Sequence, residues 1–295
     1  MSDALQTFAL QFLSGLTSAM FLFLLAAGLS LIFGVSRIIN ISHGAFYTLG
    51  AYWLVTLSAA GPLSPAVFAL AAVGGALVIA ALGAALEVVI LRRVYKGGML
   101  IVALVTFGLL ALTEEIVKIV WGAELTAAPR PRGLDGATIV AGGAMPHYSL
   151  ALVVVGLAVA GAVWLAVEKT RFGLLIRAAA ADREMLSVLG ADVPRVYTLT
   201  FALGAGLAGL AGVLAGPLVS ISPTMGSGII IEAFAVVVIG GLGSLAGSLL
   251  GAFIVGQAQA FGILLAPEST LVLLYVLMAV ILVVRPEGLL GARQA

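Results

Sequence analysis

Residues 168–195 read EKTRFGLLIRAAAADREMLSVLGADVPR and interrupt an otherwise apolar chain. This stretch carries nine charged side chains, whereas the whole chain is 62% hydrophobic and only 9% charged. Long apolar runs flank it at 149–167 and 196–219. A helix needs roughly 20 apolar residues to cross a bilayer, and a charged loop between two such helices must lie in water. The stretch therefore predicts membrane-spanning helices on both sides of an exposed loop.

The same apolar pattern recurs along nearly the whole chain. It predicts an all-α, polytopic membrane helix bundle of about eight to nine spans, forming a single domain over residues 1–295. The predicted spans are 8–34, 44–60, 64–91, 99–121, 149–167, 196–219, 229–243, 244–265 and 270–285. The first run is too long, and its flank too poor in basic residues, for a cleavable signal peptide.

One predicted span, 229–243, is short for a full crossing. Because Gly-Gly-Leu-Gly-Ser stands at its end, we predict a broken or re-entrant helix there. Small residues also recur every four positions in this half of the chain, which predicts close helix packing. They are Gly204, Ala208, Gly212 and Gly216, followed by Gly243, Gly247 and Gly251.

Basic residues predict the orientation of the spans, because Lys and Arg are enriched in cytoplasmic loops. If 35–43, 92–98, 168–195 and 285–295 face the cytoplasm, that side holds eleven Lys and Arg residues and the other side three. The eleven are Arg37, Arg92, Arg93, Lys96, Lys169, Arg171, Arg177, Arg183, Arg195, Arg285 and Arg293, and the three are Lys118, Arg130 and Arg132. We therefore predict an external N-terminus and a cytoplasmic C-terminus, provided that 229–243 crosses fully.

The segment 122–148 is rich in Pro and Gly and is the longest predicted segment on the outer face. It is either a passive connection or a docking surface for an external partner.

Motifs of catalysis do not occur. No Gly is followed by Lys, so a phosphate-binding P-loop is absent. No H-E-x-x-H pattern occurs, and neither Ser14 nor Ser227, the two serines followed by Gly, completes a G-x-S-G motif. The four aspartates all lie outside the predicted spans, and the chain has no cysteine. We therefore expect no enzymatic activity, no metal site and no bound cofactor in this chain.

Few polar residues lie in or near the spans. Asn40 and His43 stand in RIINISHGAF, where one span ends and another begins at Gly44. This motif is either an interfacial turn or a broken helix that lines a translocation path. Glu232 either faces such a path or snorkels to the membrane surface. These residues do not form a ring of like charges, which a charged ion-channel filter would need. They therefore favour a pathway for a neutral or zwitterionic solute over an ion channel.

Other charged residues of the spans are expected to neutralise one another. Glu114 and Lys118 have the spacing of an i,i+4 pair, and Glu87 precedes Arg92 and Arg93 by about one turn. We interpret both as structural ion pairs.

The opening loop favours a helix from Leu174 to Leu189, with Gly190 as its C-cap and Pro194 preventing continuation. Its charged residues have both signs, whereas a helix lying on a membrane surface prefers a uniformly basic face. The loop therefore indicates a helix that docks onto a partner protein.

Three blocks carry a family resemblance. They are GLSLIFGVSRIINISHGAFYTLGAY at 28–52, TRFGLLIRAAAADREMLSVLGADVPRVYTLTFALGAGLAGLAGVLAGPL at 170–218, and AFAVVVIGGLGSLAGSLLGAFIVG at 233–256 with RPEGLLG at 285–291. They resemble the permease subunits of ABC importers for branched-chain amino acids, over nearly the whole chain. INISHGAF resembles the permease type that pairs with a second, different permease. Permeases for urea, short amides and aromatic acids share these blocks.

The resemblance implies a multi-pass protein of the bacterial inner membrane and a set of partners. These are a second permease, two cytoplasmic P-loop ATPases that bind the ATP and Mg²⁺, an external solute-binding protein and the lipid bilayer, but no nucleic acid. The loop would be the coupling helix that contacts an ATPase. Many ABC importers carry Glu-Ala-Ala in this loop; here alanines precede Asp182-Arg183-Glu184, and Gly190 is retained.

Candidate residues follow from this resemblance. The ATPase-coupling candidates are Arg177, Asp182, Arg183, Glu184, Leu189 and Gly190. The substrate-path candidates are Asn40, His43, Gly44 and Glu232. The alternative to an ATP-driven importer is a secondary transporter, which would show inverted repeats and intramembrane ion ligands. A scaffold that moves nothing is a third alternative.

Overall fold

The computed structural model of the chain describes residues 3–140, 142–265 and 267–291, and most of them are helical. Arg293 lies outside these described residues. Within them, six helices are long and apolar enough to cross a membrane. They are α1 (Asp3–Ser36), α3 (Pro65–Leu86) with its continuation to Gly97, α5 (Met99–Trp121), α6 (His147–Lys169), α9 (Val193–Ala215) and α11 (Leu245–Leu265).

Shorter elements complete the bundle. They are α2 (His43–Leu57), η1 (Glu87–Leu91), α4 (Arg92–Val94), η2 (Tyr95–Gly97), β1 (Ala137–Val140), β2 (Gly143–Pro146), α7 (Arg171–Ala181), α8 (Arg183–Val188), α10 (Met225–Gly240), η3 (Pro267–Ser269) and α12 (Thr270–Val284). The predicted all-α membrane bundle is confirmed, and a helix stands at each predicted span. The number of eight to nine crossings stays a prediction.

The centre of the bundle is formed by α1 and α9. In their most apolar stretches 78% and 72% of the residues are buried, against 22% in α5 and α6. α9 packs against α1, α2 and α3. A Cβ at Gly212 would overlap the carbonyl oxygen of Tyr47, which shows that α2 and α9 meet backbone to backbone. The predicted close packing through small residues is confirmed.

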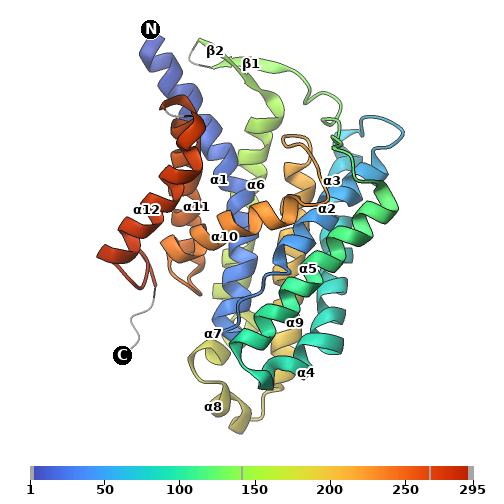
Figure 1. Cartoon of the computed structure of the whole chain (residues 1–295), viewed down its shortest axis with the longest axis vertical. Helices are drawn as coiled ribbons and strands as arrows, with labels where there is room; N and C mark the ends of the chain where they lie inside the picture. Colours follow the sequence, from blue (N-terminus) through green and yellow to red (C-terminus); the bar gives the residue numbers. More distant parts are fainter. Residues whose placement is uncertain (1–2, 141, 266, 292–295) are drawn as a thin grey trace.

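The two ends of the bundle differ in character (Figure 1). The start of α1 and the β1–β2 hairpin lie at one end, and α7 and α8 lie at the other. The hairpin pairs antiparallel from Ala137 opposite Pro146 to Val140 opposite Gly143. The sequence did not predict it. The segment 122–148 is also joined to the loop after α9, because Thr126 and Ile221 exchange two backbone hydrogen bonds of 2.9 and 2.8 Å.

The break predicted after 229–243 is present. α10 ends at Gly240, and Gly241 and Gly243 both have positive φ in the turn that leads to α11. Sixteen helical residues span only about 24 Å, less than the roughly 30 Å of hydrocarbon. The chain end completes this broken helix, since the backbone N–H groups of Leu289 and Leu290 donate to the carbonyls of Ile239 and Gly240, both at 2.9 Å. Whether α10 crosses the membrane stays a prediction.

Candidate functional site

The first feature of the site is an interruption between α1 and α2, at residues 37–42, which begins at the exposed Arg37 and becomes buried at Asn40 and Ser42. α1 ends at Ser36, and Arg37 adopts the left-handed conformation with φ of 52°. Most L-residues avoid this conformation, so a folded chain holds it only where its surroundings enforce it. Thr106 of α5 supports the non-helical backbone of the break, because its Oγ1 accepts from the N–H of Ile41 at 3.2 Å. The part of this non-helical segment around Asn40 and Ser42 is thus buried in protein, where irregular backbone is tolerated in membrane proteins.

Asn40, Ser42 and His43 are all fully buried in this break. Ser42 Oγ donates to Asn40 Oδ1 at 2.7 Å, and His43 Nε2 lies 2.9 Å from the carbonyl oxygen of Leu25. Because a carbonyl can only accept, Nε2 carries a proton, and Nδ1 is the acceptor of the neutral ring. Among the described residues, Asn40 Nδ2 and His43 Nδ1 have no hydrogen-bond partner. The break therefore offers one donor and one acceptor to a polar group that enters it.

The other two path candidates add no polar group to this pair. Gly44 is a packing position, because a Cβ there would overlap the carbonyl oxygen of Gly226 in α10. Glu232 of α10 accepts a hydrogen bond of 2.8 Å from Gln259 in α11. Of the four path candidates, the structure thus places Asn40 and His43 in one buried polar group, Gly44 beside them, and Glu232 in a separate contact.

The second feature is the charged segment, which folds as two helices. The prediction of one helix from Leu174 to Leu189 is wrong, because Asp182 breaks it with φ of −151°. The carboxylate of Asp182 instead accepts from the backbone N–H groups of Glu184 and Met185, at 2.9 and 3.0 Å, and caps α8. Gly190 has φ of 84° and ends the segment as predicted. Hence α7 and α8 meet at an elbow.

A small apolar core of its own attaches this elbow to the bundle. Ile176 and Ala179 of α7 and Leu186 of α8 are buried together with Val35 of α1 and Val196 of α9. This core fixes the segment to the end of α1, directly before the polar break. The elbow is therefore part of the folded bundle and not a free loop.

The outer surface of the elbow is exposed. Asp182, Arg183, Glu184 and Gly190 lie there, and Val188 and Leu189 are 82% and 76% exposed. Arg177 differs from these candidates, because its guanidinium pairs with Glu168 at 3.3 Å and bonds to the carbonyl of Val167. The other candidates are therefore exposed together at the tip of the elbow, whereas Arg177 holds α7 to α6.

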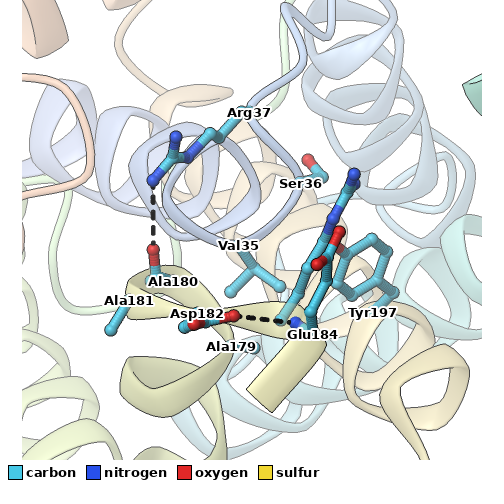
Figure 2. A pocket seen from close by; sticks show the side chains of 10 residues that line it. Val35, Ser36, Arg37, Ala179, Ala180, Ala181, Asp182, Glu184 and Tyr197 are labelled. Carbon is cyan, nitrogen blue, oxygen red and sulfur yellow. Dashed lines mark hydrogen bonds between the residues drawn. The ribbon is translucent and has the colours of Figure 1, made fainter. Parts of the chain in front are cut away.

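A cleft of about 290 Å³ separates the elbow from the end of α1 (Figure 2). Val35, Ser36 and Arg37 line one side, and residues 179–184 with Tyr197 line the other. Arg37 Nη2 donates across it to the carbonyl oxygen of Ala180 at 3.5 Å. A cation at this position suits the exposed carbonyls that end α7. Arg37 thereby joins the elbow to the polar break.

Sequence reasoning missed some partners around these sites. Lys118 pairs with Glu115 at 2.6 Å, so the predicted pair with Glu114 is wrong; Glu114 instead accepts from Ser227. No local pattern marks Ser227 or Thr106, because each becomes a partner only when a distant helix packs beside it.

The predicted pair of Glu87 and Arg92 is confirmed, at 3.0 Å. Within the described part of the chain, no three His, Cys, Asp or Glu side chains gather in a group that could hold a metal ion.

Comparison with known proteins agrees with this architecture. A family model described as "Branched-chain amino acid transport system / permease component" matches residues 11–282. The chain is 31% identical to the high-affinity branched-chain amino acid transport system permease protein LivH of Escherichia coli (strain K12), over 99% of this chain and 98% of LivH. It is 30% identical to the corresponding BraD protein of Pseudomonas aeruginosa, over 95% of each chain.

A more distant relative is the probable branched-chain amino acid transport permease protein LivH of Methanocaldococcus jannaschii. It is 26% identical, over 92% of this chain and 88% of the relative. No solved structure matches the chain significantly. Because the family model and these relatives span nearly the whole length, the chain belongs to the permease components of branched-chain amino acid transport systems.

Proposed function

We propose that this chain forms half of the membrane pathway of an ATP-binding-cassette importer for branched-chain or related amino acids. The second half would be a different permease, and two cytoplasmic ATPases and an external solute-binding protein would complete the assembly. The observation that carries this proposal is the α7–α8 elbow, which combines an exposed tip with an apolar core attached to α1 and α9. Such an element can receive a movement outside the membrane and transmit it to the bundle.

The ATPases would bind the tip of the elbow. Met185, Val188 and Leu189 are exposed apolar residues beside the mixed charges of Asp182, Arg183 and Glu184. Exposed apolar side chains ringed by charges are typical of a protein interface. ATP binding would then shift the populations of outward-open and inward-open states, because nucleotide binds the two ATPase arrangements with different affinity.

The substrate would pass near the polar break. Asn40 Nδ2 and His43 Nδ1 are a donor and an acceptor in neutral side chains, which suits a zwitterion that needs both kinds of partner. The apolar surroundings suit an aliphatic side chain. Glu232 would line a different part of the route.

We also propose that the α7–α8 end faces the cytoplasm and the β1–β2 end faces outward, in a bacterial inner membrane. The α7–α8 end carries most of the Lys and Arg residues. The start of α1 lies at the opposite end (Figure 1), so the N-terminus would be external.

The test is ATP hydrolysis and uptake by the complete assembly in proteoliposomes, with binding protein supplied on the outer side. Leucine, urea, a short amide and an aromatic acid are compared. We expect leucine to stimulate both activities more than the others. Preferential stimulation by urea or an aromatic acid would reassign the substrate, and uptake by this chain alone without nucleotide would overturn the ATP-driven mechanism.

A second test addresses the elbow. Replacing Arg183→Glu and Glu184→Lys together reverses two exposed charges while leaving both the apolar core and the Asp182 cap of α8 in place. We expect the ATPase to be lost on purification. Full retention of ATPase and transport would show that the ATPase binds elsewhere.

A further inference from the structure

Glu87 is a fully buried carboxylate near the end of α3, away from the polar break and the elbow. A buried charge in a membrane protein is costly unless it is paired and hydrogen-bonded. Both of its oxygens are engaged: Arg92 Nε lies 3.4 Å from Oε1, and Arg92 Nη2 lies 3.0 Å from Oε2. Thr198 of α9 adds a third contact, with its Oγ1 at 2.6 Å from Oε2.

A departure from α-helical geometry at residues 87–91 brings the two side chains of this pair together. In an α-helix, residues five apart point about 140° away from each other, so Glu87 and Arg92 could not face one another. Residues 87–91 instead form a π-helical turn, in which the backbone N–H of Arg92 bonds to the carbonyl of Glu87. One extra residue in the turn brings position 92 above position 87. Such turns are uncommon and frequent at functional sites.

The pair holds the first turn of α9. Arg92 Nη2 also donates to the carbonyl of Pro194 at 3.3 Å and to Thr198 Oγ1 at 2.5 Å. Pro194 lies in the first turn of α9, which directly follows the α7–α8 elbow. A displacement of the elbow that reaches α9 along the chain therefore acts on the turn that Arg92 holds, whereas Val35 and Arg37 connect the elbow separately to the end of α1.

From this point α9 reaches the polar break. A Cβ at Gly28 of α1 would lie 2.5 Å from the carbonyl oxygen of Gly204 and 3.0 Å from the ring of His43. Backbones in such close contact leave little room for independent movement. The start of α9 is thus linked to α3 by the ion pair, and its middle is linked to α1 and His43 by packing.

We propose that Glu87, Arg92 and Thr198 form a latch that makes α3 and α9 move as one body when the elbow moves. Glu87 and Arg92 are then positioning residues for transport, acting through α9 and not on substrate. This inference rests on the proposed ATP-driven function. Without the latch, the elbow would still bind the ATPase, but its movement would be lost at the junction between α3 and α9.

Uptake and ATP hydrolysis measured in the same proteoliposomes test this role. Glu87→Gln removes the charge, and Thr198→Val removes only the hydroxyl. The matched control is Arg93→Gln, which neutralises the exposed neighbouring arginine. We expect substrate imported per ATP to fall about fivefold in both latch variants, within the range that single residues along a coupling route produce. Hydrolysis and the Arg93→Gln control should stay near wild type.

An unchanged ratio of substrate imported to ATP hydrolysed in a latch variant would overturn the proposal. Because both activities are measured in the same proteoliposomes, this ratio does not depend on how much of the variant folds. Should Glu87→Gln not fold, Thr198→Val gives the answer. Absence of ATP-dependent uptake in the wild-type assembly would instead refute the proposed function. A second measurement, which does not depend on transport, then tests the latch.

That measurement uses the absence of cysteine in this chain. Spin labels at Leu82→Cys of α3 and Leu199→Cys of α9, which are 40% and 55% exposed, report the distance between the two helices. In lipid nanodiscs the latch predicts one narrow distance distribution, which Glu87→Gln broadens and Arg93→Gln does not. An equally narrow distribution in Glu87→Gln would contradict the latch.

Discussion

Glycines decide how closely the helices of this chain approach one another. At Gly44, Gly50 and Gly212 an added Cβ would meet backbone atoms of a neighbouring helix, whereas at Gly161 it would meet no atom within 4 Å. In lipid, apolar side chains gain nothing by leaving their surroundings, so close backbone packing is a main source of helix association. The cost of replacing a glycine in this chain therefore depends on whether a neighbouring helix contacts it.

Gly50→Ala is expected to destabilise the bundle, because its Cβ would overlap the carbonyl oxygen of Gly209. Overpacking of this kind costs about 1–3 kcal/mol. Thermal unfolding in detergent measures it. Gly161→Ala is the matched control on the open face of α6 and should unfold at or above the wild-type temperature. Equal effects of the two substitutions would show that α2 and α9 can separate without cost.

Asn40→Leu is expected to lower uptake while leaving ATPase binding intact. Leucine has the same branching as asparagine but is bulkier, and it removes both the buried Nδ2 donor and the Oδ1 that accepts from Ser42. Loss of one hydrogen bond to a zwitterion corresponds to about a tenfold loss of uptake. Thr113→Val is the matched control, since Thr113 bonds only to the carbonyl of Leu109 in its own helix among the contacts of the described residues. Wild-type uptake by Asn40→Leu would remove the break from the proposed path.

At the scale of elements, the elbow is decided by competition between helix propensity and capping. Residues 174–189 contain mostly good helix formers, yet Asp182 ends α7 because its short carboxylate bonds the first N–H groups of α8. The turn lets Leu186 reach Val35 and Val196 in the same apolar core as Ile176.

Asp182→Ala is expected to loosen α8, which has only six residues. Loss of an N-cap costs about 1 kcal/mol, so ATPase affinity should weaken about fivefold. Asp182→Asn keeps an oxygen that can cap the helix and should remain within about twofold of wild type. Binding of the ATPase to the permease pair in detergent measures both. If Asn weakens affinity as much as Ala, the charge of Asp182 matters and its cap does not.

At the scale of the whole molecule, the two ends of the bundle carry different surfaces. Ile139 in β1 and Val188 in α8 mark them, with exposures of 78% and 82%. Single cysteines at these positions are unambiguous because the native chain has none. In intact cells an impermeant thiol reagent should label Ile139→Cys, and it should label Val188→Cys only after lysis. The reverse pattern would invert the proposed orientation.

Much of this architecture follows from local sequence. Runs of apolar residues predict the helices, and the glycines after 229–243 predict the break behind α10. The expected ion pair of Glu87 with an arginine about one turn away is confirmed at Arg92, although the π-helical turn that lets the two side chains meet was not predicted. These features depend on neighbours within a few residues. The β1–β2 hairpin and the elbow at Asp182 were not predicted. At the elbow, the N-cap of Asp182 competes with the helix propensity of residues 174–189, and packing of Leu186 against Val35 and Val196 decides the outcome.

By itself, then, the sequence determined that the chain is a membrane helix bundle with one charged, solvent-facing segment. An apolar run long enough to cross a bilayer must satisfy its own backbone hydrogen bonds there, and a helix does so within one segment. Only the tertiary structure decided which distant residues complete each site. Thr106 supports the break of α1 and α2, Val35 anchors the elbow, and Thr198 joins Glu87. The physical reason is that a hydrogen bond or an apolar contact between helices depends on their relative position, and that position is set by packing of the whole bundle.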